Sequence, residues 1–144
     1  MLQINLNLIK AVEKTNMDKE NLKKIVALLV HVAKVDETYT KKERGIIKSF
    51  IISFSYNEKD CEIILQDAEK LESDSIQLFN FTSAVKKESL EIKTEIIEHL
   101  WKIIISDQSV DMYESSLMRR VCGLIYFPDK LSGDIKLKLL NNLS

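Results

Sequence analysis

Apolar residues recur along most of this chain at the three- and four-residue intervals of an amphipathic helix. A clear early run comprises Leu22, Ile25, Val26, Leu29 and Val32. A longer run covers 90–105, with Trp101 on its apolar side. This spacing places apolar side chains on one face of a helix, whereas a strand would alternate every second residue.

Seven segments after residue 16 carry this spacing. They begin near residues 22, 41, 57, 75, 90, 111 and 129, and the last ends near 140. Thr40 and Glu43 fit a capping box at the start of the second segment. Over the first dozen residues the pattern fits a strand or a helix, and we expect a helix because a lone strand would have no partner. The pattern predicts an all-α fold, a single compact bundle of about seven helices over residues 1–144.

The composition supports helices and excludes some classes of function. The 144 residues include only three glycines and one proline, fewer than strands joined by tight turns need. The formal net charge is −1, which argues against nucleic acid as a partner. Arg119 and Arg120, with Lys130, Lys136 and Lys138, make the C-terminal quarter slightly basic and leave an anionic partner open.

The chain shows no signal peptide and no membrane span. Its start lacks a basic segment followed by an apolar run, and no window has the ~20 apolar residues that a span requires. Cys61 and Cys122 lie beside apolar residues at helical spacing, which is typical of buried thiols. We therefore expect a cytoplasmic protein. Peripheral membrane association through partners and a homodimer remain open.

An internal repeat distinguishes this chain from a generic helical bundle. The segment 29–51 aligns without gaps on 100–122, at a constant interval of 71 residues. Two acidic positions are identical in both copies, Asp36 with Asp107 and Glu43 with Glu114. Each copy reads as an apolar helix, an Asp, six residues, a Glu and a second apolar helix. We expect two helix–turn–helix hairpins packed about a pseudo-twofold axis.

Several of these residues, in their order and spacing, resemble the TerB-like family. The resembling segments are 29–36 with Glu43, Phe81-Thr82, Leu100-Trp101, Asp107, Val110, Tyr113-Glu114, 117–120 and 124–126, within about 22–140. The resemblance implies an all-helical fold, a link to tellurite resistance and chemical stress, and a divalent metal held by acidic residues. It implies no catalytic activity. The family has Gly after each motif Asp, where this chain has Glu37 and Gln108.

The four repeated acids are the candidate metal ligands. Asp36, Glu43, Asp107 and Glu114 offer carboxylate oxygens, which suit Ca²⁺ or Mg²⁺ better than Zn²⁺. The competing interpretation is that the glutamates are helix caps, where an acid is favourable by roughly 0.3–1 kcal/mol without a metal. The aspartates follow helix C-termini, the unfavourable end of the dipole, and so give the better indication of function.

No catalytic constellation can be assembled from the rest of the chain. The sequence has no Gly-rich phosphate loop and no Ser flanked by glycines as in a nucleophile elbow. His31 and His99 lack suitable ligands one helical turn away. The sequence thus predicts a non-catalytic stress-response protein of the tellurite-resistance type, which acts through other proteins and binds a divalent cation. The alternative is a helical protein–protein interaction module without a metal.

Overall fold

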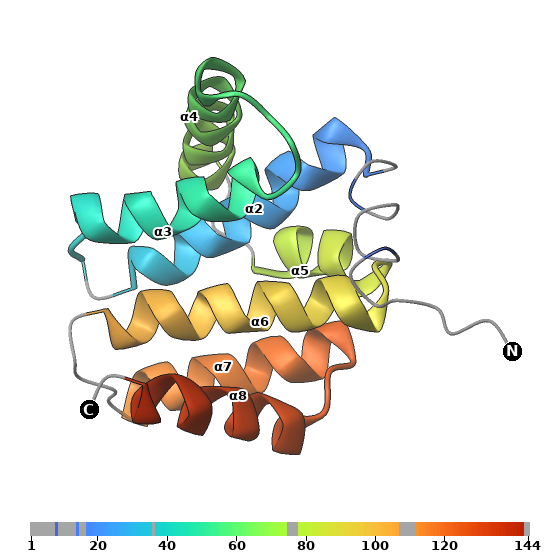
Figure 1. Cartoon of the computed structure of the whole chain (residues 1–144). Coiled ribbons are helices and arrows are strands. Elements are labelled where there is room, and N and C mark those ends of the chain that lie inside the picture. Colours follow the sequence, from blue (N-terminus) through green and yellow to red (C-terminus); the bar gives the residue numbers. More distant parts are fainter. Residues whose placement is uncertain are drawn as a thin grey trace, which may run out of the picture.

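Seven helices form the described part of the chain, which contains no strand, as the hydrophobic pattern predicts (Figure 1). The computed structural model describes residues 8, 14, 17–35, 37–74, 78–106 and 112–142. The helices are α2 (Lys19–Ala33), α3 (Lys41–Ile52), α4 (Glu58–Asp74), α5 (Leu78–Lys86), α6 (Leu90–Ile105), α7 (Met112–Ile125) and α8 (Asp129–Asn141). The helix predicted over the first dozen residues lies outside the described residues, apart from Leu8.

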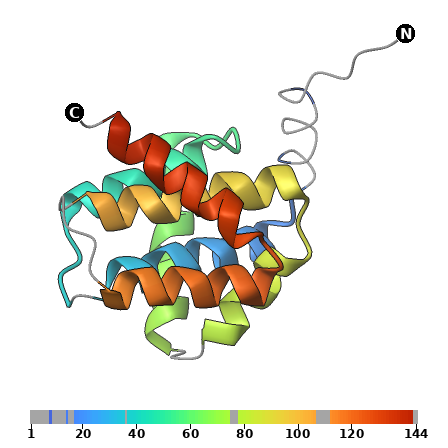
Figure 2. The same ribbon diagram turned by 90° about the horizontal axis from the view of Figure 1, so that it is seen from below.

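Helix α2 forms the centre of the bundle. Every side chain from Ile25 to Val30 is fully buried, so this stretch is apolar around its whole circumference. It contacts α3, α4, α5 and α6. Figures 1 and 2 show α6 running alongside it, with α7 and α8 beyond. The apolar faces of α2 and α6 together supply half of the buried apolar residues in the described core.

Side-chain caps fix where several helices begin. Asp18 precedes α2 and accepts a hydrogen bond from the backbone N–H of Glu20. Thr40 and Glu43 form the predicted capping box at α3. Ser89 accepts from the third residue of α6. Each cap satisfies backbone N–H groups that have no partner within the helix, which stabilises that boundary by about 1 kcal/mol.

The predicted core residues are buried as expected. Cys61 and Cys122 are at most 1% exposed and form no disulfide, and burial raises the pKa of both thiols. Trp101 is also in the core, with 4% of its surface exposed. None of the helices in the described ranges is long and apolar enough to cross a bilayer.

The helices follow the 71-residue interval of the aligned segments. Helices α2, α3 and α4 begin at residues 19, 41 and 58, whereas α6, α7 and α8 begin at 90, 112 and 129, so each pair of starts is 71 residues apart. Two residues with positive φ, Ser55 and Tyr126, lie 71 residues apart as well. The helix starts thus keep the interval of the aligned sequence segments, and the packing of two hairpins about a pseudo-twofold axis stays a prediction.

Candidate functional site

The helix ends that flank the two acidic turns lie at the same end of the bundle. Figure 1 shows the C-terminal ends of α2 and α6 and the N-terminal ends of α3 and α7 on one side. A direct contact joins two of them, because Lys42 Nζ in the first turn of α3 donates to the carbonyl of Ser106 at 3.0 Å. Ser106 caps the C-terminus of α6. The sequence alone could not decide whether the turns share an end.

The structure describes two of the four candidate ligands. Glu43 lies in the first turn of α3 and Glu114 in the first turn of α7. Asp36 and Asp107 lie outside the described residues. The prediction that these four acids bind a divalent cation therefore stays a prediction, and whether the two turns converge on one ion stays open.

Glu43 has a structural role as a cap. Its Oε1 accepts from the backbone N–H of Thr40 at 2.8 Å and from Thr40 Oγ1 at 3.0 Å, and its own N–H donates to Thr40 Oγ1 at 3.1 Å. The residue is only 7% exposed. One carboxylate oxygen is thus committed to the helix terminus, as the capping interpretation predicts.

The first turn keeps a left-handed backbone where the family has glycine. Glu37 has a φ of 66°, and its N–H donates to the carbonyl of Lys34 at 3.0 Å. A non-glycine residue pays roughly 1–2 kcal/mol in this region, because its Cβ crowds the backbone. Glu37 therefore holds this turn in a backbone conformation that glycine favours.

Lys42 contributes a positive charge to this end that the sequence did not single out. In the sequence, Lys42 simply follows Lys41 as one of two adjacent lysines. The contact of Lys42 with Ser106 depends on how α3 and α6 pack, so no local sequence signal could have revealed this contact. A cation is favourable beside the carbonyls at a helix C-terminus, and Lys42 stabilises the end of α6 in this way.

Both histidines interact with groups on the helices rather than with a cluster of possible metal ligands. His99 Nδ1 lies 2.8 Å from the carbonyl of Glu95, and burial lowers the pKa of this imidazole. His31 Nδ1 lies 3.5 Å from Glu72 Oε1. Across the described ranges, no group of three or more His, Cys, Asp and Glu side chains is arranged to hold a metal ion. A metal site would therefore have to include acids from outside those ranges.

These features define an all-helical domain in which the helix ends that flank the two acidic motifs lie at one end. Residues 22–137 match the family model described as "Tellurite resistance protein TerB". The chain belongs to this family, as its motifs indicated. No significant match was found among curated proteins or solved structures.

Proposed function

We propose that this protein is a non-catalytic accessory component of the tellurite-resistance type, which acts through other proteins and binds a divalent cation at the end of the bundle that carries the two acidic turns. Membership of the TerB family supports the first part. The contact of Lys42 with Ser106 supports the second, since it brings together helix ends that flank both turns.

The chemistry of the candidate ligands favours a hard cation. Asp36, Glu43, Asp107 and Glu114 would offer only carboxylate oxygens. Ca²⁺ and Mg²⁺ take oxygen ligands, whereas Zn²⁺ sites usually include His or Cys. The left-handed Glu37 adds support, because it keeps the turn beside Asp36 in the backbone region that glycine favours.

Thermal unfolding with Ca²⁺, Mg²⁺ or Zn²⁺ tests the cation directly. An ion that binds only the folded state at 100 times its Kd adds about 2.7 kcal/mol, which raises Tm by several degrees. We expect Ca²⁺ or Mg²⁺ to raise Tm, and the double variant Asp36→Asn, Asp107→Asn to lose this rise. The matched control is Asp74→Asn with Asp134→Asn, which removes two exposed acids from α4 and α8. An equal rise in the double variant would overturn the proposed ligands.

A second candidate is a helical interaction module without a metal. The completed capping box of Glu43 favours it, since this acid already has a structural purpose. The ammonium group of Lys42 favours it too, because it supplies a cation at the end of α6. On this alternative, no divalent ion changes Tm beyond the effect of ionic strength.

A further inference from the structure

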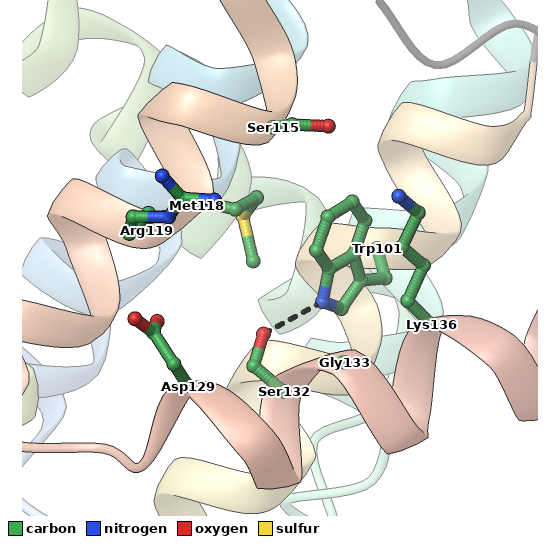
Figure 3. A pocket seen from close by; sticks show the side chains of 8 residues that line it. All are labelled: Trp101, Ser115, Met118, Arg119, Asp129, Ser132, Gly133 and Lys136. Atoms are coloured by element: carbon green, nitrogen blue, oxygen red, sulfur yellow. Dashed lines mark hydrogen bonds between the residues drawn. The ribbon is translucent and has the colours of Figure 1, made fainter. Parts of the chain in front are cut away.

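A pocket of about 210 Å³ opens between α7 and α8 (Figure 3). Three charged side chains line it, Arg119 from α7 with Asp129 and Lys136 from α8. Met118 and the edge of Trp101 form its apolar wall. Of the repeated acids that the structure describes, neither Glu43 nor Glu114 lines this pocket.

Two residues that line this pocket, Trp101 and Ser132, are held in place by a hydrogen bond, while a third, Gly133, has no side chain. Trp101 Nε1 donates to Ser132 Oγ at 2.9 Å, and this buried hydrogen bond ties α8 to α6. The next residue, Gly133, lies inside α8, where glycine costs roughly 1 kcal/mol relative to alanine. A Cβ at Gly133 would meet no atom within 4 Å. Packing therefore does not explain why this position is glycine.

The corresponding place in the first half of the chain is occupied by a carboxylate. The position 71 residues before Gly133 is Glu62, and the position 71 before Arg119 is Lys48. Lys48 Nζ lies 2.9 Å from Glu62 Oε2, and Arg44 Nη1 donates to the same oxygen at 3.3 Å. The first half thus places its own carboxylate between two cations, at the junction of α3 and α4.

The second half has two cations at its pocket but lacks that carboxylate. Arg119 aligns with Lys48 and Gly133 with Glu62. The second cation comes from a different position, because Arg44 aligns with Ser115 and Lys136 aligns with Leu65. Within the described part of the chain, neither cation forms an ion pair. Lys136 Nζ lies 5.2 Å from the centroid of the Trp101 ring, which holds it beside the pocket.

We propose that this pocket binds a carboxylate group supplied from outside the chain, much as Arg44 and Lys48 bind Glu62 in the first half. Arg119 and Lys136 would donate to its oxygens. An Arg guanidinium is well suited to this, because its N–H groups match the two oxygens of a carboxylate. The space left by Gly133 would admit the group.

The charges of the pocket favour a carboxylate over a phosphate. Arg119 and Lys136 with Asp129 carry a net charge of +1 (two positive, one negative), which a single carboxylate neutralises. A phosphate monoester carries about −1.5 to −2 at neutral pH, and Asp129 would repel it more strongly. The apolar edges of Met118 and Trp101 further suit an organic ion.

Binding can be measured through Trp101, because the chain has one tryptophan. We would titrate the protein with acetate, with a short Asp-containing peptide and with inorganic phosphate at constant ionic strength, and follow Trp101 fluorescence and its indole N–H resonance. We expect a saturable response to carboxylates. Arg119→Gln should weaken it at least about tenfold, the equivalent of one charge-assisted hydrogen bond. The neighbouring Arg120→Gln, which lies outside the pocket, should leave it unchanged.

The substitution Gly133→Glu tests the comparison with Glu62 without any ligand. Glu and Gln have similar helix propensities, so Gly133→Gln controls for the helix and for the filled space. We expect Gly133→Glu to give the higher Tm of the two, and the difference to vanish when Arg119→Gln is added. Both substitutions at position 133 should abolish the response of Trp101 to carboxylates. Gly123→Gln, in an open position on α7, should not.

The outcomes separate clearly. A peptide that binds much more tightly than acetate assigns the carboxylate to a protein partner, and equal affinities assign it to a small organic acid. No saturable response, tighter binding of phosphate, or equal losses in Arg119→Gln and Arg120→Gln would overturn the proposal. The double variant Asp36→Asn, Asp107→Asn should bind carboxylates as the wild type does. The carboxylate proposal can therefore be wrong while the proposed cation site is right, and the reverse.

Discussion

Helices α4 and α8 begin 71 residues apart, at positions 58 and 129, yet they pack on the rest of the bundle very differently. Helix α4 packs on α2 and α3 and buries four side chains, those of Cys61, Ile64, Leu65 and Ala68. Helix α8 packs on α6 and α7, and among its own residues only Ser132 is buried. Helix α4 therefore buries several of its own side chains, whereas a pocket opens between α7 and α8.

Ion pairs strengthen the junction between α3 and α4. Arg44 on α3 bonds to Glu62 and Glu69 on α4, and Glu69 also accepts from the Tyr39 hydroxyl at 2.7 Å. Lys48 adds another contact to Glu62. No ion pair links α7 to α8 within the described residues. The comparison shows that similar helix positions need not preserve the chemistry between the helices.

The largest expected difference between α4 and α8 lies in the free energy that their apolar contacts contribute. Ile64 on α4 is fully buried, whereas Ile135, 71 residues later on α8, is only partly buried. We expect Ile64→Ala to lower the free energy of unfolding by about 3 kcal/mol, because it leaves a cavity in a packed core. Ile135→Ala should cost about 1 kcal/mol, in proportion to the smaller apolar area it exposes. Urea unfolding gives both values. Equal costs would show that α8 is as firmly packed as α4.

A smaller difference should appear in the dependence of stability on pH. Hydrogen bonds from Arg44, and then from Lys48, lower the pKa of Glu62 from 4.5 to about 2. A carboxylate with a lowered pKa stabilises the folded state above its unfolded value, so this contribution is present above about pH 4.5. It is lost as the pH falls towards 2.

Glu62→Gln should remove this acid-sensitive contribution. Because about a third of the Glu62 side chain is exposed, solvent screens the pair and we expect a loss of about 1 kcal/mol at neutral pH. The variant and the wild type should then converge in stability near pH 2. The control is Glu58→Gln, an exposed acid on the same helix. An unchanged difference between Glu62→Gln and wild type from pH 7 to pH 2 would contradict the assignment.

Features that depend on a few neighbouring residues could be predicted from the sequence. The hydrophobic period predicts α6 with the bounds that the structure gives it, Leu90–Ile105. The capping box of Thr40 and Glu43 is equally local, since each side chain bonds the backbone three residues away. The burial of both cysteines follows from the same helical spacing.

The pocket and the shared end of the bundle could not be predicted in this way. The pocket requires Arg119, Gly133 and Trp101, which lie on three different helices. A signal did exist in the sequence, because extending the 71-residue interval beyond position 122 pairs Gly133 with Glu62. Its meaning depends on the contacts of Glu62, which only the structure shows. The proximity of Lys42 to Ser106 likewise depends on tertiary packing.

The smallest expected effects concern the two left-handed residues that follow α3 and α7. Ser55 has a φ of 70° and Tyr126 a φ of 59°, both in the region that glycine favours. We expect Ser55→Gly to raise the free energy of unfolding by about 0.5–1 kcal/mol, because it relieves the crowding of Cβ. Ser53→Gly is the control, since Ser53 has a φ of −61° and glycine there should be neutral or destabilising.

Tyr126→Gly should gain less than Ser55→Gly, because it also removes an interaction. Lys86 Nζ lies 4.6 Å from the centroid of the Tyr126 ring, and such exposed cation–π contacts contribute roughly 0.5–1 kcal/mol. The free energy gained by relieving the crowding of Cβ and that lost with the Lys86 contact should nearly cancel. Lys86→Gln should therefore destabilise the wild type but not the Tyr126→Gly variant. If Tyr126→Gly instead gains as much as Ser55→Gly, the contact with Lys86 contributes nothing to stability. The strained, exposed tyrosine would then need an explanation outside the folding of this chain.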